Sequence, residues 1–199
     1  MLRRPYGPTA WWVEDVADPA AWAAGLQQSR TIPDAIVDVL PAEDSVVVRC
    51  AAGALDAVGE FLDGVRPSEV DSSIAPVDVP VVYDGSDLAQ VAEHAGLSVD
   101  DVVERHAAGD YRVAFCGFSP GFAYMTGLDP TLEVPRRTHP RTRVPAGSVA
   151  IAAHYAAVYP SASPGGWHLL GHTERIVWNT AAASPALLRP GIPVRFRPI

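Results

Sequence analysis

The hydrophobic and polar positions of the first part of the chain follow strand and helix patterns in turn. Apolar runs typical of strands lie at residues 9–13, 35–40, 45–50 and 77–83. Apolar side chains at helical spacing lie at residues 19–29 and 54–65. The resulting order, strand, helix, strand, strand, helix, strand, predicts a ferredoxin-like α/β domain over residues 1–85.

Sequence signals at the helix ends support this assignment. Asp18 and Pro19 suit the start of the first helix, because a carboxylate accepts hydrogen bonds from free amides and proline has no amide to leave unpaired. Residues 86–110 are expected to form a connector of two helices, 87–95 and 99–107, the second beginning at a capping box of Ser98 and Asp101.

From residue 111 onward the pattern changes to short runs of β-branched and small residues separated by glycine and proline. The predicted strands include 112–116, 148–153, 168–170, 176–178 and 194–196. Short strands with frequent turn residues are typical of a small β-barrel, which we expect over residues 111–199.

Composition excludes several kinds of chemistry. The 199 residues include 15 arginines and no lysine, so Schiff-base catalysis and a phosphate-binding loop that ends in Gly-Lys are excluded. Cys50 and Cys116 cannot form a disulfide framework, and His168 and His172 lack a third clustered ligand, so no metal site is expected. No apolar run is long enough to span a membrane or serve as a signal peptide, so the expected location is the cytoplasm.

The net charge of −8 is unevenly divided along the chain. Residues 1–110 hold 20 acidic side chains and 6 arginines, whereas residues 111–199 hold 3 and 9. The two connector helices resemble a helix-turn-helix, but the second presents Asp100, Asp101 and Glu104, which would repel phosphates. We therefore expect no nucleic-acid partner. The basic half could instead receive a carboxylate, a phosphate or an acidic protein surface.

Residues 117–121 match the G-x-S-x-G pattern of serine hydrolases. In that motif the amide of the residue after the serine stabilises an oxyanion, but here that residue is Pro120, which has no amide. We therefore interpret the segment as a rigid turn that directs Phe118, Phe122 and Tyr124 to a common point.

The densest signal is the segment 135–145, which carries four arginines and three prolines in PRRTHPRTRVP. A proline-stiffened loop cannot be helical and loses less entropy when it orders around an anion. Composition alone favours a solvated loop that pairs with the acidic half. The nearby PAGS and SPGGW sequences are glycine turns that allow backbone amides to approach a ligand.

These motifs together resemble one known family. The strings FCGFSPGFAYMTGLD, PRRTHPRTRVPAGSVAI, YPSASPGGWHLLGHT and RPGIPVRFRPI are similar to the family that contains the B subunit of 5-oxoprolinase, the Kip inhibitor of sporulation kinase and allophanate hydrolase subunit 1. The resemblance is strong over residues 81–199 and is limited to length and hydrophobic pattern over residues 1–75. It implies an α+β fold, in which an N-terminal α/β domain precedes a cyclophilin-like β-barrel.

The resemblance also implies an activity and partners. The expected function is that of the B subunit in an ATP-dependent 5-oxoprolinase, an amidohydrolase that opens 5-oxo-L-proline to L-glutamate. Such a chain works with the homologous C subunit and with the A subunit, so it should be inactive alone. ATP is expected at the level of the complex. The alternatives are a component of a urea- or allophanate-type carboxyltransferase and a kinase-binding regulator.

Matching the family motifs residue by residue implies a ligand pocket in the barrel. Its expected residues are Phe118, Gly121, Tyr124, Arg136, Arg141, Ser148, Tyr159, Ser163, Gly165, Gly166 and Trp167. Arg136 and Arg141 are expected to bind a small carboxylate or a phosphate-bearing ligand. Two neighbouring guanidiniums need a counter-charge, and the acidic residues lie mostly in the other half of the chain. The catalytic residues stay unassigned.

Overall fold

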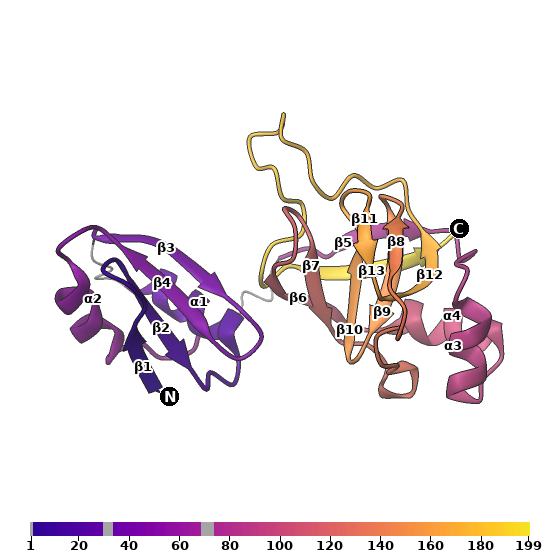
Figure 1. Cartoon of the computed structure of the whole chain (residues 1–199), viewed down its shortest axis with the longest axis horizontal. Helices are drawn as coiled ribbons and strands as arrows, with labels where there is room; N and C mark the ends of the chain where they lie inside the picture. Colours follow the sequence, from indigo (N-terminus) through magenta and orange to yellow (C-terminus); the bar gives the residue numbers. More distant parts are fainter. Residues whose placement is uncertain (1, 30–33, 69–73) are drawn as a thin grey trace. The chain divides into compact units, whose positions relative to one another are not determined.

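The computed structural model of the chain describes residues 2–29, 34–68 and 74–199, which fall into two units, Met1–Ser73 and Ile74–Ile199 (Figure 1). The first unit contains β1 (Leu2–Pro5), β2 (Ala10–Glu14), α1 (Pro19–Gln28), β3 (Ile36–Pro41), β4 (Val46–Cys50) and α2 (Leu55–Leu62). Its four strands form one sheet in the order β1-β2-β4-β3, with antiparallel neighbours throughout.

The core of the first unit is formed by side chains that the sheet and its two helices direct toward each other. Val13, Val46 and Val48 from the strands are buried with Trp22 of α1 and Leu62 of α2. Helix α1 begins as predicted, since the side chain of Asp18 accepts a hydrogen bond from the amide of Ala21 at 2.9 Å and Pro19 occupies the first turn.

The strand predicted at 77–83 is present, but its assignment to the first unit is wrong. Strand β5 (Val77–Val81) pairs in parallel with β13 (Pro193–Pro198) in the second unit. The edge position beside β2 is taken instead by β1, which the sequence pattern did not reveal. The ferredoxin-like arrangement is therefore not confirmed. What is present is a β2-α1-β3 connection with β4 inserted between the two strands.

The second unit is built on a sheet in the order β12-β9-β10-β7-β6-β13-β5. Its strands are β5, β6 (Tyr111–Cys116), β7 (Ala123–Thr126), β9 (Ser148–Ala152), β10 (Tyr155–Val158), β12 (His168–His172) and β13. The chain just after β5 meets the end of β12, because Val82 and His172 exchange two backbone hydrogen bonds of 3.0 and 2.9 Å. This contact nearly closes the sheet into a barrel.

Other elements surround this barrel. Helices α3 (Leu88–Ala95) and α4 (Val99–Ala108) follow β5, and η1 (Pro130–Leu132) follows β7. Strands β8 (Arg141–Val144) and β11 (Ser163–Gly165) pair only with each other. The capping box predicted at the start of α4 is present, with Ser98 and Asp101 each bonded to the other's backbone amide. The strand predicted at 176–178 is wrong, since only Trp178 makes an isolated bridge there.

One cluster of buried side chains joins the helices to the barrel. It includes Val91 of α3, Val102 of α4, Val113 of β6, Ile151 of β9 and Phe196 of β13. Because β5 lies in this cluster through Val79 and Val81, helices α3 and α4 are part of the barrel unit. In the described parts of the chain, no helix has the length and apolar character needed to cross a membrane.

A buried histidine lies where α4 packs on the barrel. His106 has no exposed surface, and its Nδ1 atom lies 2.7 Å from the hydroxyl of Tyr83, while its ring packs on Tyr111 and Phe196. Burial lowers the pKa of His106 to about 3. The folded protein therefore holds this ring neutral at pH values where an unfolded chain would protonate it.

We expect the free energy of unfolding to decrease as the pH falls below about 6.5, the ordinary pKa of histidine, because the unfolded chain takes up a proton that the folded chain excludes. The contribution of His106 should reach about 1.4 kcal/mol per pH unit. Urea unfolding between about pH 7 and pH 5 would measure this slope. His106→Gln should remove it and His154→Gln, an exposed control, should keep it. Identical slopes for all three proteins would contradict the prediction.

Candidate functional site

The arginine segment of the barrel unit is fixed by one buried carboxylate. Asp87 lies immediately before α3, and its side chain is only 4% exposed. Its Oδ1 atom accepts hydrogen bonds from Arg137 Nη1 and Arg141 Nη2, both at 2.7 Å, and its Oδ2 atom accepts one from the amide of Leu169 at 2.8 Å. One carboxylate therefore connects the start of α3, the arginine segment and β12.

The charge state of Asp87 follows from these contacts. Burial alone would raise its pKa, but the hydrogen bonds from Arg141 and from the Leu169 amide, together with the charges of Arg141 and Arg137, lower the pKa below its ordinary value. The carboxylate is ionised at neutral pH. It provides Arg141 with the counter-charge that the sequence analysis expected from a bound carboxylate or phosphate.

A small cavity of about 70 Å³ lies on the barrel, and we call it the aromatic cavity. It is lined by Phe118, Phe122, Tyr124, Arg136, Tyr159, Gly165, Gly166 and Trp167. The ring of Phe122 is its centre, with ring centroids of Phe118, Tyr124, Tyr159 and Trp167 between 5.1 and 5.5 Å away. The turn at 117–121 does direct these aromatic side chains to a common point.

Glycine at 165 is required by the packing of this cavity. A Cβ atom at Gly165 would lie 2.2 Å from the hydroxyl oxygen of Tyr159, which is too close for any side chain. Gly166 has no such restriction, because a Cβ there would meet only ordinary contacts at 3.7 Å. Its carbonyl instead accepts a hydrogen bond from the amide of Arg137 at 2.8 Å. Burial raises the pKa of Tyr159, so this hydroxyl stays protonated.

Seven of the eleven expected pocket residues line the aromatic cavity, and four do not. Arg141 donates to Asp87 and, at 2.9 Å, to Ser86. Ser148 is buried in β9, where its carbonyl accepts from the Tyr159 amide. Ser163 begins β11 beside the cavity. Gly121 has a φ of 81° and packs against Trp178, so its role is in the turn.

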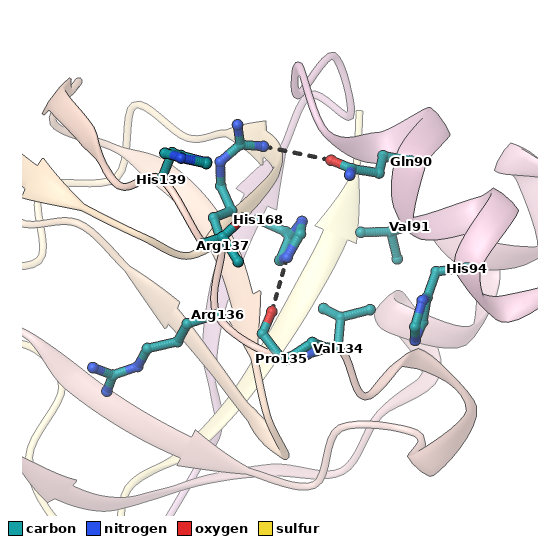
Figure 2. Close-up of a pocket in the computed structure, with 10 residues that line it drawn as sticks. Gln90, Val91, His94, Val134, Pro135, Arg136, Arg137, His139 and His168 are labelled. Carbon is teal, nitrogen blue, oxygen red and sulfur yellow. Dashed lines mark hydrogen bonds between the residues drawn. The ribbon is translucent and has the colours of Figure 1, made fainter.

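A second, larger cavity lies on the other side of the arginine segment, and we call it the histidine cavity (Figure 2). Its volume is about 250 Å³. It is lined by Gln90, Val91, His94, Val134, Pro135, Arg136, Arg137, Thr138, His139 and His168. Arg136 contributes to both cavities, and Figure 2 shows its side chain extending away from Gln90 and His94.

Asp87 and two polar residues of this second cavity, Gln90 and His94, were not predicted from the sequence. The even spacing of His168 and His172 would place both side chains on one face of a regular strand. A register shift between Leu169 and Gly171 breaks that alternation, so His168 is buried while His172 is exposed and contacts Asp84 at 2.8 Å. Within the described ranges, no group of three or more His, Cys, Asp or Glu side chains is placed to hold a metal ion.

Comparison with known proteins places these features in context. The family model described as carboxyltransferase domain, subdomain C and D, matches residues 4–188. A protein from Escherichia coli O157:H7, named as the B subunit of 5-oxoprolinase, is 43% identical over 170 residues, which cover 82% of this chain and 78% of that protein.

Two solved structures are similar in fold. TTHA0988 superposes with a TM-score of 0.84 and 32% identity, covering all of this chain but only 41% of the other. The urea amidolyase of K. lactis superposes with a TM-score of 0.72 over 99% of this chain and 15% of that protein. At 18% identity, this second likeness is one of fold alone.

We expect Asp87→Asn to lower the free energy of unfolding by about 3 kcal/mol, because it removes the one charge that compensates two partly buried guanidiniums. Chemical denaturation at neutral pH would measure the loss. Asp84→Asn is the matched control. Its carboxylate is 59% exposed and pairs only with His172, so its removal should cost less than about 1 kcal/mol. Equal losses for the two variants would contradict the role given to Asp87.

Proposed function

The chain belongs to the carboxyltransferase family of subdomains C and D, and from this premise we propose that it is the B subunit of an ATP-dependent 5-oxoprolinase. In this proposal it acts with the homologous C subunit and with the A subunit to open 5-oxo-L-proline to L-glutamate. The observation that carries the proposal is the similarity to the E. coli protein of that name, which extends over most of both chains.

We propose that the substrate binds at the aromatic cavity. A five-membered lactam is a flat, largely apolar ring with one carboxylate, which suits aromatic walls beside a single guanidinium. Phe122 and Trp167 are buried in the cavity wall, whereas Arg136 is exposed and unpaired among the described residues, so it is free to bind the carboxylate. Because the enclosed volume is small, the substrate's carboxylate would lie at the mouth, next to Arg136 and Phe118.

The chemical step is proposed to need the other subunits. Ring opening of a lactam with ATP requires groups that bind the phosphates and groups that activate water. This chain has no lysine, and its one serine in a nucleophile-like turn, Ser119, is followed by Pro120, which has no amide to donate. We therefore assign substrate binding to this chain and leave nucleotide chemistry to the complex.

A second candidate function is that of a component of a urea- or allophanate-type carboxyltransferase, which the fold likeness to urea amidolyase favours. Such an enzyme would handle a carboxylated, biotin-linked substrate. Avidin, which sequesters biotin, should then inhibit the assembled complex. A 5-oxoprolinase should be unaffected by avidin.

The isolated chain should show no ATP hydrolysis that depends on 5-oxoproline, because it has no phosphate-binding loop that ends in Gly-Lys and no activated nucleophile. Phosphate release would be measured for this chain alone, for its partner subunits alone, and for the reconstituted complex. Activity should appear only in the complex. Turnover by the purified single chain would overturn the dependence on partners.

Arg136→Gln should raise the KM of the complex for 5-oxoproline at least about tenfold, the scale of one lost charge-assisted hydrogen bond. The KM for ATP should stay unchanged. Arg143→Gln is the matched control, since Arg143 is exposed in the same segment and does not line either cavity. If both variants have the wild-type KM for 5-oxoproline, the substrate does not bind at the aromatic cavity in the way proposed.

A further inference from the structure

We propose that the histidine cavity binds phosphate, either as the free inorganic ion or as the phosphoryl group of a nucleotide. The cavity is separate from the aromatic cavity to which the substrate is assigned above, and the argument rests on its own residues. Three elements supply them: α3, the extended segment 134–139, and the start of β12 (Figure 2).

The charge around the cavity is positive. Arg137 lines it, and Arg141 donates to the same Asp87 oxygen as Arg137. Asp87 thus offers one negative charge to two guanidiniums, and its Oδ2 atom is already bonded to the Leu169 amide. None of the described residues that line the cavity is Asp or Glu. An anion from solution would therefore complete the charge balance at this wall.

Arg137 has hydrogen-bonding capacity left for such an anion. Its Nη1 atom donates to Asp87 at 2.7 Å and approaches the side-chain oxygen of Gln90 at 3.4 Å. Its Nε atom is buried and has no acceptor among the described residues. The Nε and Nη2 edge of a guanidinium is the edge that can bind two oxygens side by side. Asp87 therefore holds the guanidinium through Nη1, and the Nε atom on the other edge has no acceptor among the described residues.

His168 distinguishes phosphate from a carboxylate. The ring is 8% exposed, and its Nε2 atom lies 2.9 Å from the carbonyl oxygen of Pro135, which can only accept (Figure 2). In the neutral ring the proton therefore lies on Nε2, which leaves Nδ1 as a buried acceptor without a partner in the described structure. Monohydrogen phosphate has an O–H donor as well as acceptor oxygens. A carboxylate has only acceptors, so phosphate can satisfy both Arg137 and His168.

The arrangement of the polar side chains also suits a tetrahedral ligand. Gln90 and His94 approach from α3, Arg137 and His139 from the extended segment, and His168 from the barrel. A planar carboxylate meets donors close to its own plane, whereas the oxygens of phosphate point in four directions and can each meet a different element. A volume of about 250 Å³ is below that of a pocket for a drug-sized ligand and suits a small group.

If the proposed function is correct, the two cavities have a joint use. Arg136 and Arg137 are consecutive residues, and the first contributes to the aromatic cavity while the second anchors the histidine cavity. A carboxylate substrate and a phosphate would then bind on opposite sides of one short backbone segment. Phosphate formed by ATP hydrolysis could remain bound to this chain close to the substrate.

Isothermal titration of the full chain with inorganic phosphate, in a buffer free of phosphate and sulfate, tests the proposal. Wild type should bind one phosphate saturably, and Arg137→Gln should bind it at least about tenfold more weakly. His139→Ala changes an exposed side chain outside the Asp87 cluster, so it should fold normally and still weaken binding several-fold. Arg143→Gln and His154→Gln, exposed elsewhere, should match wild type.

Further titrations identify the source of the phosphate. ADP that binds more tightly than inorganic phosphate, and is weakened by Arg137→Gln, would indicate the phosphoryl group of a nucleotide. Binding of inorganic phosphate with no gain from ADP would indicate the free ion. Absence of saturable phosphate binding, equal affinity in wild type and both cavity variants, or displacement of phosphate by 5-oxoproline would overturn the proposal.

The titration is independent of turnover. If the complex is an active 5-oxoprolinase but this chain does not bind phosphate, the phosphate-site proposal is wrong and the proposed function stands. If phosphate binding depends on Arg137 but the complex has no 5-oxoprolinase activity, the proposed function is wrong and the phosphate-site proposal stands.

Discussion

The geometry of the candidate site depends on the buried carboxylate of Asp87. Its two oxygens bind two guanidiniums and one backbone amide, and these three donors come from the arginine segment and from β12. A proline-rich segment has few backbone hydrogen bonds of its own with which to fix its position. The ion pairs therefore determine which way Arg137 and Arg141 point, whereas the guanidinium of Arg136 has no partner among the described residues.

Both cavities follow from this arrangement. The arginine segment contributes residues to both cavities, since Arg136 lines each of them. The amide of Arg137 donates a hydrogen bond to the carbonyl of Gly166, which fixes this segment next to the glycine turn of the aromatic cavity. Because α3 begins directly after Asp87 and carries the side chains of Gln90 and His94, a shift of this helix would alter the histidine cavity and the arginine positions together.

Much of the local structure could be predicted from the sequence, because it depends on neighbours in the chain. The cap at Asp18, the capping box at Ser98 and the aromatic turn before Tyr124 are of this kind. Pairing between distant segments could not be predicted. The strand at 77–81 has the same pattern whether it joins β2 or β13, and the bulge that separates His168 from His172 has no sequence signature.

The division of charge between residues 1–110 and 111–199 does not follow the division of the chain into structural units. Counted by structural unit, residues 1–73 carry 12 acidic side chains and 5 arginines, while residues 74–199 carry 11 and 10. The acidic helices belong to the barrel unit, so a counter-ion for the arginine segment was available within it. A boundary near residue 110, where the composition changes, assigns Asp87 to the acidic half, although Asp87 and the arginine segment belong to the same structural unit.

The position of β13 has a consequence for how the protein is made. It is the last strand in the chain, yet it lies inside the sheet between β6 and β5. During synthesis the first unit can fold from its own strands, but β5 and β6 have no partner on that side until β13 has left the ribosome. Until then the nascent barrel exposes two unpaired strand edges, which can pair with other chains and favour aggregation.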